Sequence, residues 1–302
     1  MAEMWVSDQW KDYELLDCGR GEKLERWGNR ILLRPDPQAI WDTPRQEPRW
    51  ERPDAVYRRS STGGGAWDKN TLPASWRIQY KNLRFQVKPM NFKHTGIFPE
   101  QAVNWDWAAE KIRAAGRPIR VLNLFAYTGA ATCACLAAGA SVCHVDAAKG
   151  MVSWAKENAQ CCDVADRSVR WIVDDCLKFI RREIRRNSFY DAVIMDPPSY
   201  GRGPNGEVWR LEDNLWELAC TVRDVLSDHP LFVLINSYTT GLSPSVLSYI
   251  GQTVYTAGFG GRAEARELGL PVTATGMNLP CGSSCRWEAE PMEFHKNGAS
   301  HA

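Results

Sequence analysis

One stretch of the sequence, residues 120–146, restricts the fold more than any other. It reads RVLNLFAYTGAATCACLAAGASVCHVD, in which an apolar run precedes Gly129, small residues follow it, and a second apolar run ends at Asp146. An apolar strand, a glycine turn, a helix and a second strand together form a βαβ unit. We therefore expect parallel strands, with a ligand bound beyond their carboxyl ends.

The same alternation of strand and helix continues along the chain. Strands are predicted at 120–126, 141–147, 169–174, 190–196 and 231–237, and helices at 100–115, 129–138, 150–160, 175–186, 212–228 and 244–257. This order predicts an α/β fold with a mostly parallel, Rossmann-like sheet. The segments 262–270 and 284–290 have no helix between them, which predicts an antiparallel hairpin at one edge.

Residues 1–87 lack this alternation. They are predicted to form a small β-rich appendage, which leaves 88–302 as the Rossmann-like domain. Hairpins are expected at 22–34, with a turn at Gly28-Asn29, and at 76–87, around Lys81-Asn82. Two roles remain open for the appendage, a lid or packing element and a module that recognises the substrate.

Composition limits the class of protein. A net charge of +1 neither requires nor excludes a polyanionic partner. No apolar run is long enough to span a membrane, and no signal peptide opens the sequence. The ten cysteines are interpreted as free thiols, so we expect a cytoplasmic protein. Cys281 and Cys285 lack a second pair at zinc-binding spacing, and no metal is expected.

The turn at Gly129 favours a particular cofactor. A dinucleotide fold places three glycines there to approach a pyrophosphate, whereas Ala130 and Ala131 follow this single glycine. S-adenosylmethionine has an adenosine but no phosphate, and it fits better. Asp146 can accept hydrogen bonds from the ribose hydroxyls, and Asp175 from the adenine amino group. The alternative is that these acids only cap the helices that follow them.

A second motif, Asp196-Pro197-Pro198-Ser199-Tyr200, ends another apolar strand. The prolines fix the backbone and leave their carbonyls to accept hydrogen bonds. Beside them, Asp196 can hold an amino group, and Tyr200 offers a ring on which a base can stack. The alternative is a rigid loop beneath a substrate pocket. No cysteine lies in this motif or in 236–241, which argues against a cysteine-dependent 5-methylcytosine mechanism.

These motifs resemble the class I S-adenosylmethionine-dependent methyltransferases akin to the bacterial 23S ribosomal RNA base methyltransferases. The resemblance is carried by 96–101 with Asn104, 123–129, Val145-Asp146 with Lys149, 154–158, Asp175 and 196–200. It implies catalytic roles for Asp196, Pro197 and Tyr200. With neighbouring residues at the same strand ends, the expected cofactor site comprises Phe98, Gln101, Asn123, Phe125, Ala126, Tyr127, Thr128, Gly129, Asp146, Ala147, Lys149, Asp174, Asp175, Cys176 and Asp196.

The resemblance therefore favours a methyltransferase that acts on a nucleobase of RNA, ribosomal RNA in particular, at nitrogen. Two alternatives stay open: methylation of a protein or small molecule, and a non-catalytic RNA-binding protein that retains the cofactor fold. The arginines of 181–186 fit either a phosphate contact or a solvated helix face.

Overall fold

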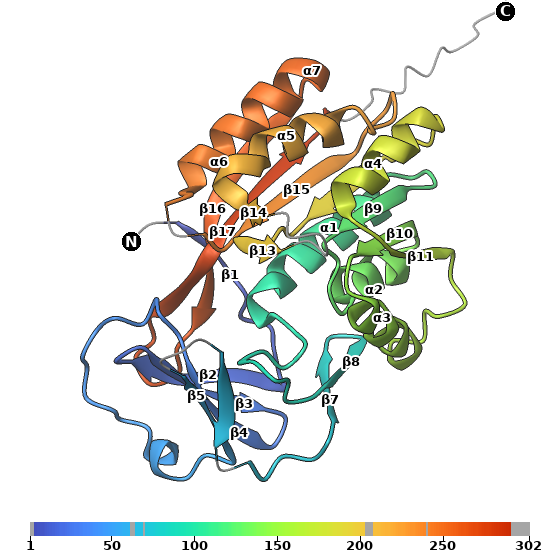
Figure 1. The fold of residues 1–302 in the computed structure, drawn as a ribbon. Helices are drawn as coiled ribbons and strands as arrows, with labels where there is room; N and C mark the ends of the chain where they lie inside the picture. The colour runs from blue at the N-terminus through green and yellow to red at the C-terminus, as the bar shows by residue number, and fades with distance from the viewer. Residues whose placement is uncertain (1–2, 61–63, 69, 203–207, 240, 291–302) are drawn as a thin grey trace, which may run out of the picture.

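The computed structural model describes residues 3–60, 64–68, 70–202, 208–239 and 241–290. An eight-stranded sheet forms its centre (Figure 1). In spatial order the strands are β1 (Met4–Val6), β16 (Arg262–Pro271), β17 (Asn278–Glu288), β15 (Phe232–Ser237), β12 (Ala192–Met195), β9 (Arg120–Leu124), β10 (Ser141–Asp146) and β11 (Val169–Val173). From β15 to β11 neighbouring strands are parallel, and β17 runs antiparallel to β15 and β16.

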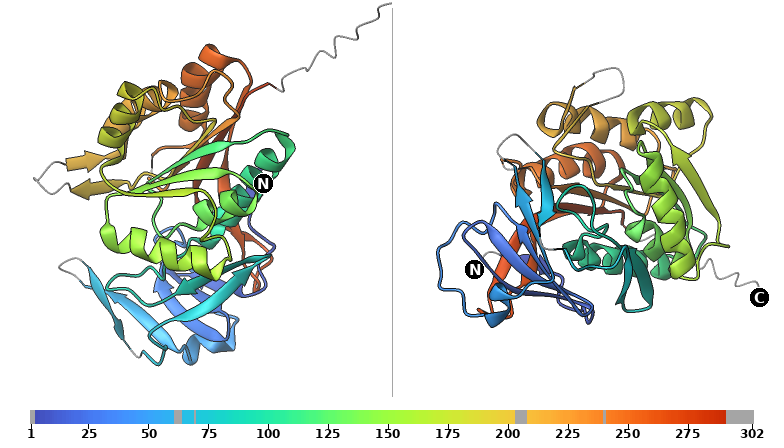
Figure 2. Two further views of the ribbon diagram at one scale, coloured as in Figure 1. Left: turned by 90° about the vertical axis from the view of Figure 1, so that its right-hand side faces the viewer. Right: turned by 60° about the horizontal axis from the view of Figure 1, so that its bottom comes forward.

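Helices cover both faces of this sheet (Figures 1 and 2). One layer comprises α1 (Ala102–Ala114), α2 (Ala130–Ala137) and α3 (Lys149–Cys161), and the other α4 (Cys176–Arg185), α5 (Leu211–Arg223) and α6 (Pro244–Gly251). Successive side chains of a strand point to opposite faces. In β12, Ile194 packs with the first layer and Val193 with the second. Both faces are therefore buried, as in other parallel sheets.

The predicted Rossmann-like fold is confirmed, with two local differences in its helices. Helix α5 ends at Arg223 rather than at residue 228, because the chain turns back and Ser227 N donates to the carbonyl of Tyr190 at 2.8 Å. The predicted helix 244–257 is not uniform: after α6, a π-helical segment (Gln252–Thr256) leads into the short α7 (Ala257–Phe259).

The amino-terminal part is rich in strands, as expected. A five-stranded sheet contains β2 (Tyr13–Gly19), β3 (Glu22–Trp27), β4 (Arg30–Pro35), β5 (Ala55–Arg59) and β6 (Gly65–Asp68), with a 3₁₀ turn at Pro48–Glu51. The hairpin of β7 (Trp76–Tyr80) and β8 (Leu83–Val87) follows. Both predicted hairpins are present. The division at residue 87 stays a proposal, and residues 291–302 of its second part lie outside the described residues.

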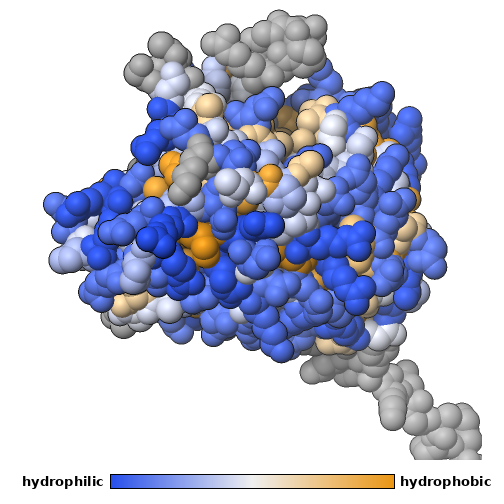
Figure 3. All heavy atoms as spheres, turned by 90° about the horizontal axis from the view of Figure 1, so that it is seen from below, coloured by the Kyte–Doolittle hydropathy of each residue, from blue (hydrophilic) through white to orange (hydrophobic). Residues whose placement is uncertain are grey.

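Strand β1 links the two parts in a way that the sequence did not predict. It pairs in parallel with β16 and continues the large sheet beyond the predicted hairpin. The small sheet contacts the same hairpin, because Thr273 N donates to the Leu15 carbonyl and Ala274 N to the Leu16 carbonyl, both at 2.9 Å. Its outward side is mainly hydrophilic (Figure 3). Among the described residues, no helix has the length and apolar character needed to cross a membrane.

Candidate active site

The turn between β9 and α2 has an unusual backbone. Phe125 and Tyr127 have φ values of 53° and 49°, and Gly129 has a φ of 80°. Left-handed conformations are uncommon for residues other than glycine, and such strain clusters at functional sites. A Cβ at Gly129 would lie 2.8 Å from Ala155 Cβ, so the turn also needs glycine for close packing against α3. These features mark the turn as a functional loop.

Hydrogen bonds hold this loop against the segment that follows β8. Thr128 Oγ1 donates to the Gly96 carbonyl, and Asn158 Nδ2 donates to the Thr128 carbonyl at 2.8 Å. The side-chain oxygen of Asn158, Oδ1, accepts a hydrogen bond from Gln86 N at 2.9 Å. The loop conformation is thus fixed by buried polar groups before any ligand arrives.

Asp146, at the end of β10, faces the same loop. Its carboxylate accepts from Tyr127 N at 2.9 Å and from Ala148 N at 2.8 Å. Burial raises the pKa of Asp146, while these two amide hydrogen bonds lower it. Each carboxylate oxygen has a second lone pair. Asp146 therefore retains the capacity to accept from ribose hydroxyls while it orders the loop.

The residues at the end of β11 have local partners. Asp175 caps α4, because its Oδ1 accepts from Lys178 N at 2.8 Å. Asp174 forms an ion pair with Arg182. The buried Cys176 Sγ accepts from Phe125 N at 3.3 Å and so joins this strand end to the β9 loop. Capping is the alternative that the sequence left open for Asp175, and an adenine contact remains a prediction.

A cavity lies where β9, β12 and β15 end beneath α1, and we refer to it as the strand-end cavity. It brings together nine of the expected cofactor-site residues: Phe98, Gln101, Asn123, Phe125, Ala126, Tyr127, Thr128, Gly129 and Asp196. Asp146, Ala147, Lys149, Asp174, Asp175 and Cys176 are not part of its lining and lie at or just beyond the ends of β10 and β11.

A buried polar network supports the cavity from α1. Asn104 Nδ2 donates to Gln101 Oε1 at 2.8 Å and to Ser284 Oγ at 2.9 Å. Asn104 Oδ1 accepts from Arg286, and Asn236 Nδ2 donates to Gln101 Oε1 at 3.1 Å. The amide side chains are therefore held in fixed orientations. Asn236 was not assigned to the site, although an asparagine in an otherwise apolar strand was a visible signal.

Asp196 is at the wall of the strand-end cavity. Its Oδ1 is buried and, within the described part of the chain, has no hydrogen-bond partner. Burial and the nearby charge of Glu100 raise the pKa of Asp196 to about 7, and the Asn236 amide lowers it. A buried acceptor without a donor is costly for the protein alone. A ligand that donates a hydrogen bond would satisfy it.

The loop after Asp196 differs from expectation in one respect. The sequence predicted that both proline carbonyls stay free, but the Pro198 carbonyl accepts from Trp209 Nε1 at 2.7 Å. Trp209 belongs to a hairpin that was not predicted, β13 (Tyr200–Arg202) and β14 (Val208–Arg210), which projects from the body of the molecule (Figure 2). Pro197 is buried. Tyr200 is 52% exposed and is not part of the strand-end cavity's lining.

Comparison with known proteins identifies the family. Residues 53–217 match the family described as S-adenosylmethionine-dependent methyltransferase. The chain belongs to this family. A crystal structure of the S-adenosylmethionine-dependent methyltransferase from Agrobacterium tumefaciens is 36% identical with a TM-score of 0.89, over 95% of this chain and 93% of that one. A Streptococcus mutans structure, 18% identical over 93% of this chain and 76% of its own, has a TM-score of 0.70 and shows the shared fold.

Among curated relatives, the ribosomal RNA large subunit methyltransferase K/L of Shewanella sp. (strain MR-4) is 31% identical over 148 residues. The match covers 48% of this chain and 18% of the relative, so the chain spans about a fifth of that protein's length. The predicted family and its cofactor, S-adenosylmethionine, are confirmed.

The residues present fit this cofactor. The loop with a single glycine, the spare acceptor capacity of Asp146 and the unsatisfied Asp196 Oδ1 lie along one edge of the sheet. In the described ranges, no group of three metal-ligating side chains occurs. In the arginine run at 181–186, Arg181 pairs with Glu217 and Arg186 with Glu183, which favours the solvated-face interpretation.

Proposed function

We propose that this protein transfers the methyl group of S-adenosylmethionine to a nitrogen of a nucleobase in RNA, with ribosomal RNA as the first candidate. The observation that carries the proposal is the buried Oδ1 of Asp196, which has no hydrogen-bond partner among the described residues and belongs to an Asp-Pro-Pro loop at the wall of the strand-end cavity. The amino and ring N–H groups of nucleobases are the donors that such an acceptor recognises.

Bound S-adenosylmethionine supplies an electrophilic methyl group. The role of the protein is to position the acceptor nitrogen in line with it, which accounts for much of the rate in such displacements. Asp196 Oδ1, which has no hydrogen-bond partner in the described part of the chain, and the Pro197 carbonyl are two acceptors that can hold an amino group. Trp209 keeps the loop in place through the Pro198 carbonyl. If the acceptor is an exocyclic amine, the new N–C bond replaces the bond from sulfur to the methyl carbon, and S-adenosylhomocysteine would be the leaving group. Asp196 takes the proton that the nitrogen loses and passes it to water.

The names of the relatives support RNA as the acceptor. The curated relatives that match about half of the chain are ribosomal RNA methyltransferases. The absence of cysteine from both strand-end motifs supports nitrogen over carbon 5 of a pyrimidine.

Transfer of tritium from labelled S-adenosylmethionine into separated RNA, protein and metabolite fractions tests the proposal. Label in RNA, followed by nucleoside analysis that finds an N-methylated base, is the expected result. Asp196→Ala should abolish transfer and preserve the affinity for S-adenosylhomocysteine, whereas Asp213→Ala, on the exposed side of α5, should change neither. Label found only in protein or metabolites would refute the RNA acceptor, and transfer by Asp196→Ala at the wild-type rate would refute the role of Asp196.

A further inference from the structure

A second cavity lies beside the strand-end cavity, between the amino-terminal sheet and the Asp196 loop. Its walls come from β3 and β4, from the segment after β8 that contains Lys93, and from Pro198 and Ser199. Ile97 and Phe98 line both cavities, so the two cavities are adjacent. We call the second one the cationic cavity, because Lys23, Arg34 and Lys93 all line it.

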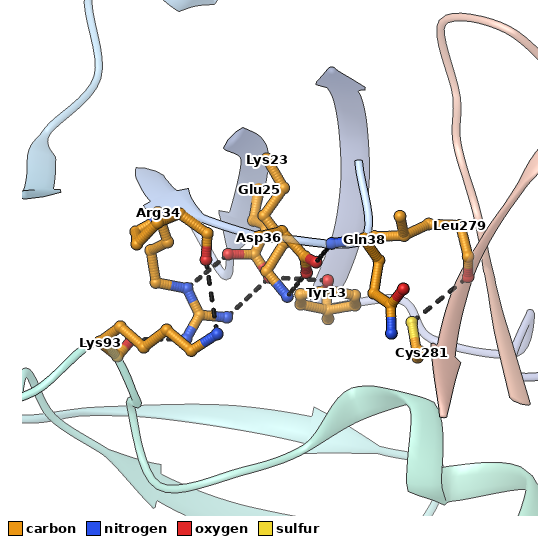
Figure 4. A network of polar contacts seen from close by, with 10 residues as sticks. Tyr13, Lys23, Glu25, Arg34, Asp36, Gln38, Lys93, Leu279 and Cys281 are labelled. Atoms are coloured by element: carbon orange, nitrogen blue, oxygen red, sulfur yellow. Dashed lines mark hydrogen bonds and ion pairs between the residues drawn. The ribbon is translucent and has the colours of Figure 1, made fainter. Parts of the chain in front are cut away.

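Two of these cations are already neutralised. Arg34 forms a two-point ion pair with Glu25, at 2.6 and 2.7 Å, and Lys23 lies 3.2 Å from Asp36 and 3.6 Å from Glu25 (Figure 4). Tyr13 donates its hydroxyl to Glu25 at 2.8 Å. The charges of Arg34 and Lys23 are therefore paired with carboxylates of the amino-terminal part, Glu25 and Asp36.

Lys93 differs from them. In the part of the chain that the structure describes, it has no carboxylate partner, and its Nζ is 3.5 Å from the carbonyl of Pro35. Its own carbonyl accepts from Arg34 Nη1 at 2.8 Å, which fixes the backbone beneath the side chain. In Figure 4 the Lys93 side chain extends from the segment after β8 alongside Arg34. Lys93 is thus a positioned, half-buried cation with spare donors.

Two acids, Asp36 and Glu100, also line the cavity, together with His94. Burial, with Lys23 and Arg34, lowers the pKa of Lys93 to about 8, and Asp36 opposes this only in part. Burial also raises the pKa of Glu100, and burial with the nearby cations lowers the pKa of His94 to about 3. Within the described ranges, Lys93 is the lysine of this cavity that no carboxylate pairs with, and an anionic ligand would complement it.

We propose that the cationic cavity binds a phosphate group of the methyl acceptor, with Lys93 as the direct contact. Lysine is a common phosphate ligand because it presents a compact charge with rotatable donors. Pro198 and Ser199 border the cavity, so a phosphate there lies next to a base held at Asp196. This assignment rests on the proposed function in taking the acceptor to be a nucleotide, and it gives the amino-terminal sheet a part in substrate recognition.

Inorganic phosphate tests the anion site independently of RNA. Thermal unfolding in phosphate is compared with unfolding in chloride at equal ionic strength, for the wild type, Lys93→Met, Lys93→Arg and Lys156→Met. Lys156 is an exposed lysine of α3 and serves as the matched control. Phosphate should raise the Tm of the wild type, Lys93→Arg and Lys156→Met, because it binds the folded state. An equal rise in Lys93→Met would overturn the inference.

Fragmented ribosomal RNA as probe then identifies the source of the phosphate. Lys93→Met should bind this RNA about tenfold more weakly than the wild type. The slope of log K against the logarithm of the salt concentration should also be smaller in magnitude by roughly 0.7 to 0.9, the value for one lost phosphate contact. Lys156→Met should bind as the wild type does. RNA binding that does not change in Lys93→Met would overturn the placement of an RNA phosphate here. A phosphate effect that requires Lys93, together with label transfer only into phosphorylated metabolites, would keep the anion site and refute the RNA function instead.

Discussion

The indole nitrogen of Trp209 donates a hydrogen bond to the carbonyl oxygen of Pro198 at 2.7 Å. The same indole packs against Phe125, with ring centroids 5.6 Å apart. One side chain thus contacts both the loop proposed to hold the acceptor and the loop at the cofactor site. Any shift of the β13–β14 hairpin would therefore move Pro198 relative to the β9 loop.

Replacement of Trp209 by Phe keeps an aromatic ring near Phe125 but removes the donor to Pro198. We expect kcat to fall about fivefold to tenfold, since one hydrogen bond contributes on the order of 1 kcal/mol. The affinity for S-adenosylhomocysteine, measured by calorimetry, should stay within about twofold. Trp216→Phe is the control, because this tryptophan of α5 is 51% exposed. A lower cofactor affinity with unchanged kcat would contradict a positioning role at the acceptor loop.

The rate of methyl transfer should depend on the protonation of Asp196. Burial raises the pKa of this carboxyl to about 7, and protonation removes a lone pair that the proposed amino group needs. We expect kcat to rise as the pH increases from about 6 to 8 and to level off above that. Single-turnover rates across this range check it, with cofactor affinity measured in parallel. A flat profile would show that the carboxylate form of Asp196 is not required.

The burial of Asp196 should also lower the free energy of unfolding at neutral pH. Its folded pKa of about 7 exceeds the value near 3.9 of an unfolded aspartate. Between these values the folded state holds a proton that the unfolded state has lost, so the free energy of unfolding falls as pH rises from about 4 to 7. At pH 8, Asp196→Asn should raise the free energy of unfolding by on the order of 2 kcal/mol. At pH 4 the difference should nearly vanish; equal effects at both pH values would exclude this linkage.

Gly129 is required both for its φ of 80° and for its contact with α3. Gly129→Ala adds about 1–2 kcal/mol of left-handed strain and about 1–3 kcal/mol of overpacking against Ala155. Denaturant unfolding should show a loss of stability equal to the sum of these two contributions. The affinity for the cofactor should also fall, because the loop moves. Gly276→Ala is the matched control: it has a φ of 68° and open space around it, so it should show the strain alone. Equal destabilisation by the two variants would contradict the packing argument.

The sequence predicted the large sheet well because its signals are local and repeated. Apolar strands such as Ala192–Met195 and small-residue helices such as Ala130–Ala137 have periodic patterns that need no tertiary information. The single glycine at 129 and the acid at 146 likewise lie at strand ends by connectivity alone. The fold and the identity of the cofactor followed from these features.

The parts that were missed depend on contacts between distant segments. Strand β1 has three residues and exists only because β16 is beside it. The bond from Trp209 to Pro198 and the charge cluster around Arg34 join segments that no sequence period connects. Lys93 is distinctive only because its neighbours have carboxylate partners and it has none among the residues that the structure describes. Such features come from burial and pairing, which a single sequence does not display.

The pairing of Met4 with Glu267 has a consequence for synthesis of the chain on the ribosome. Residues 4–6 leave the ribosome long before residues 262–271 have been synthesised. The outermost strand of the large sheet therefore has no pairing strand during most of translation. The amino-terminal sheet contacts the 271–278 turn, so these contacts also form only after that turn has been synthesised. Docking of the two parts is therefore a late event. Nascent chains that stall before residue 262 should remain open to proteases in their first residues.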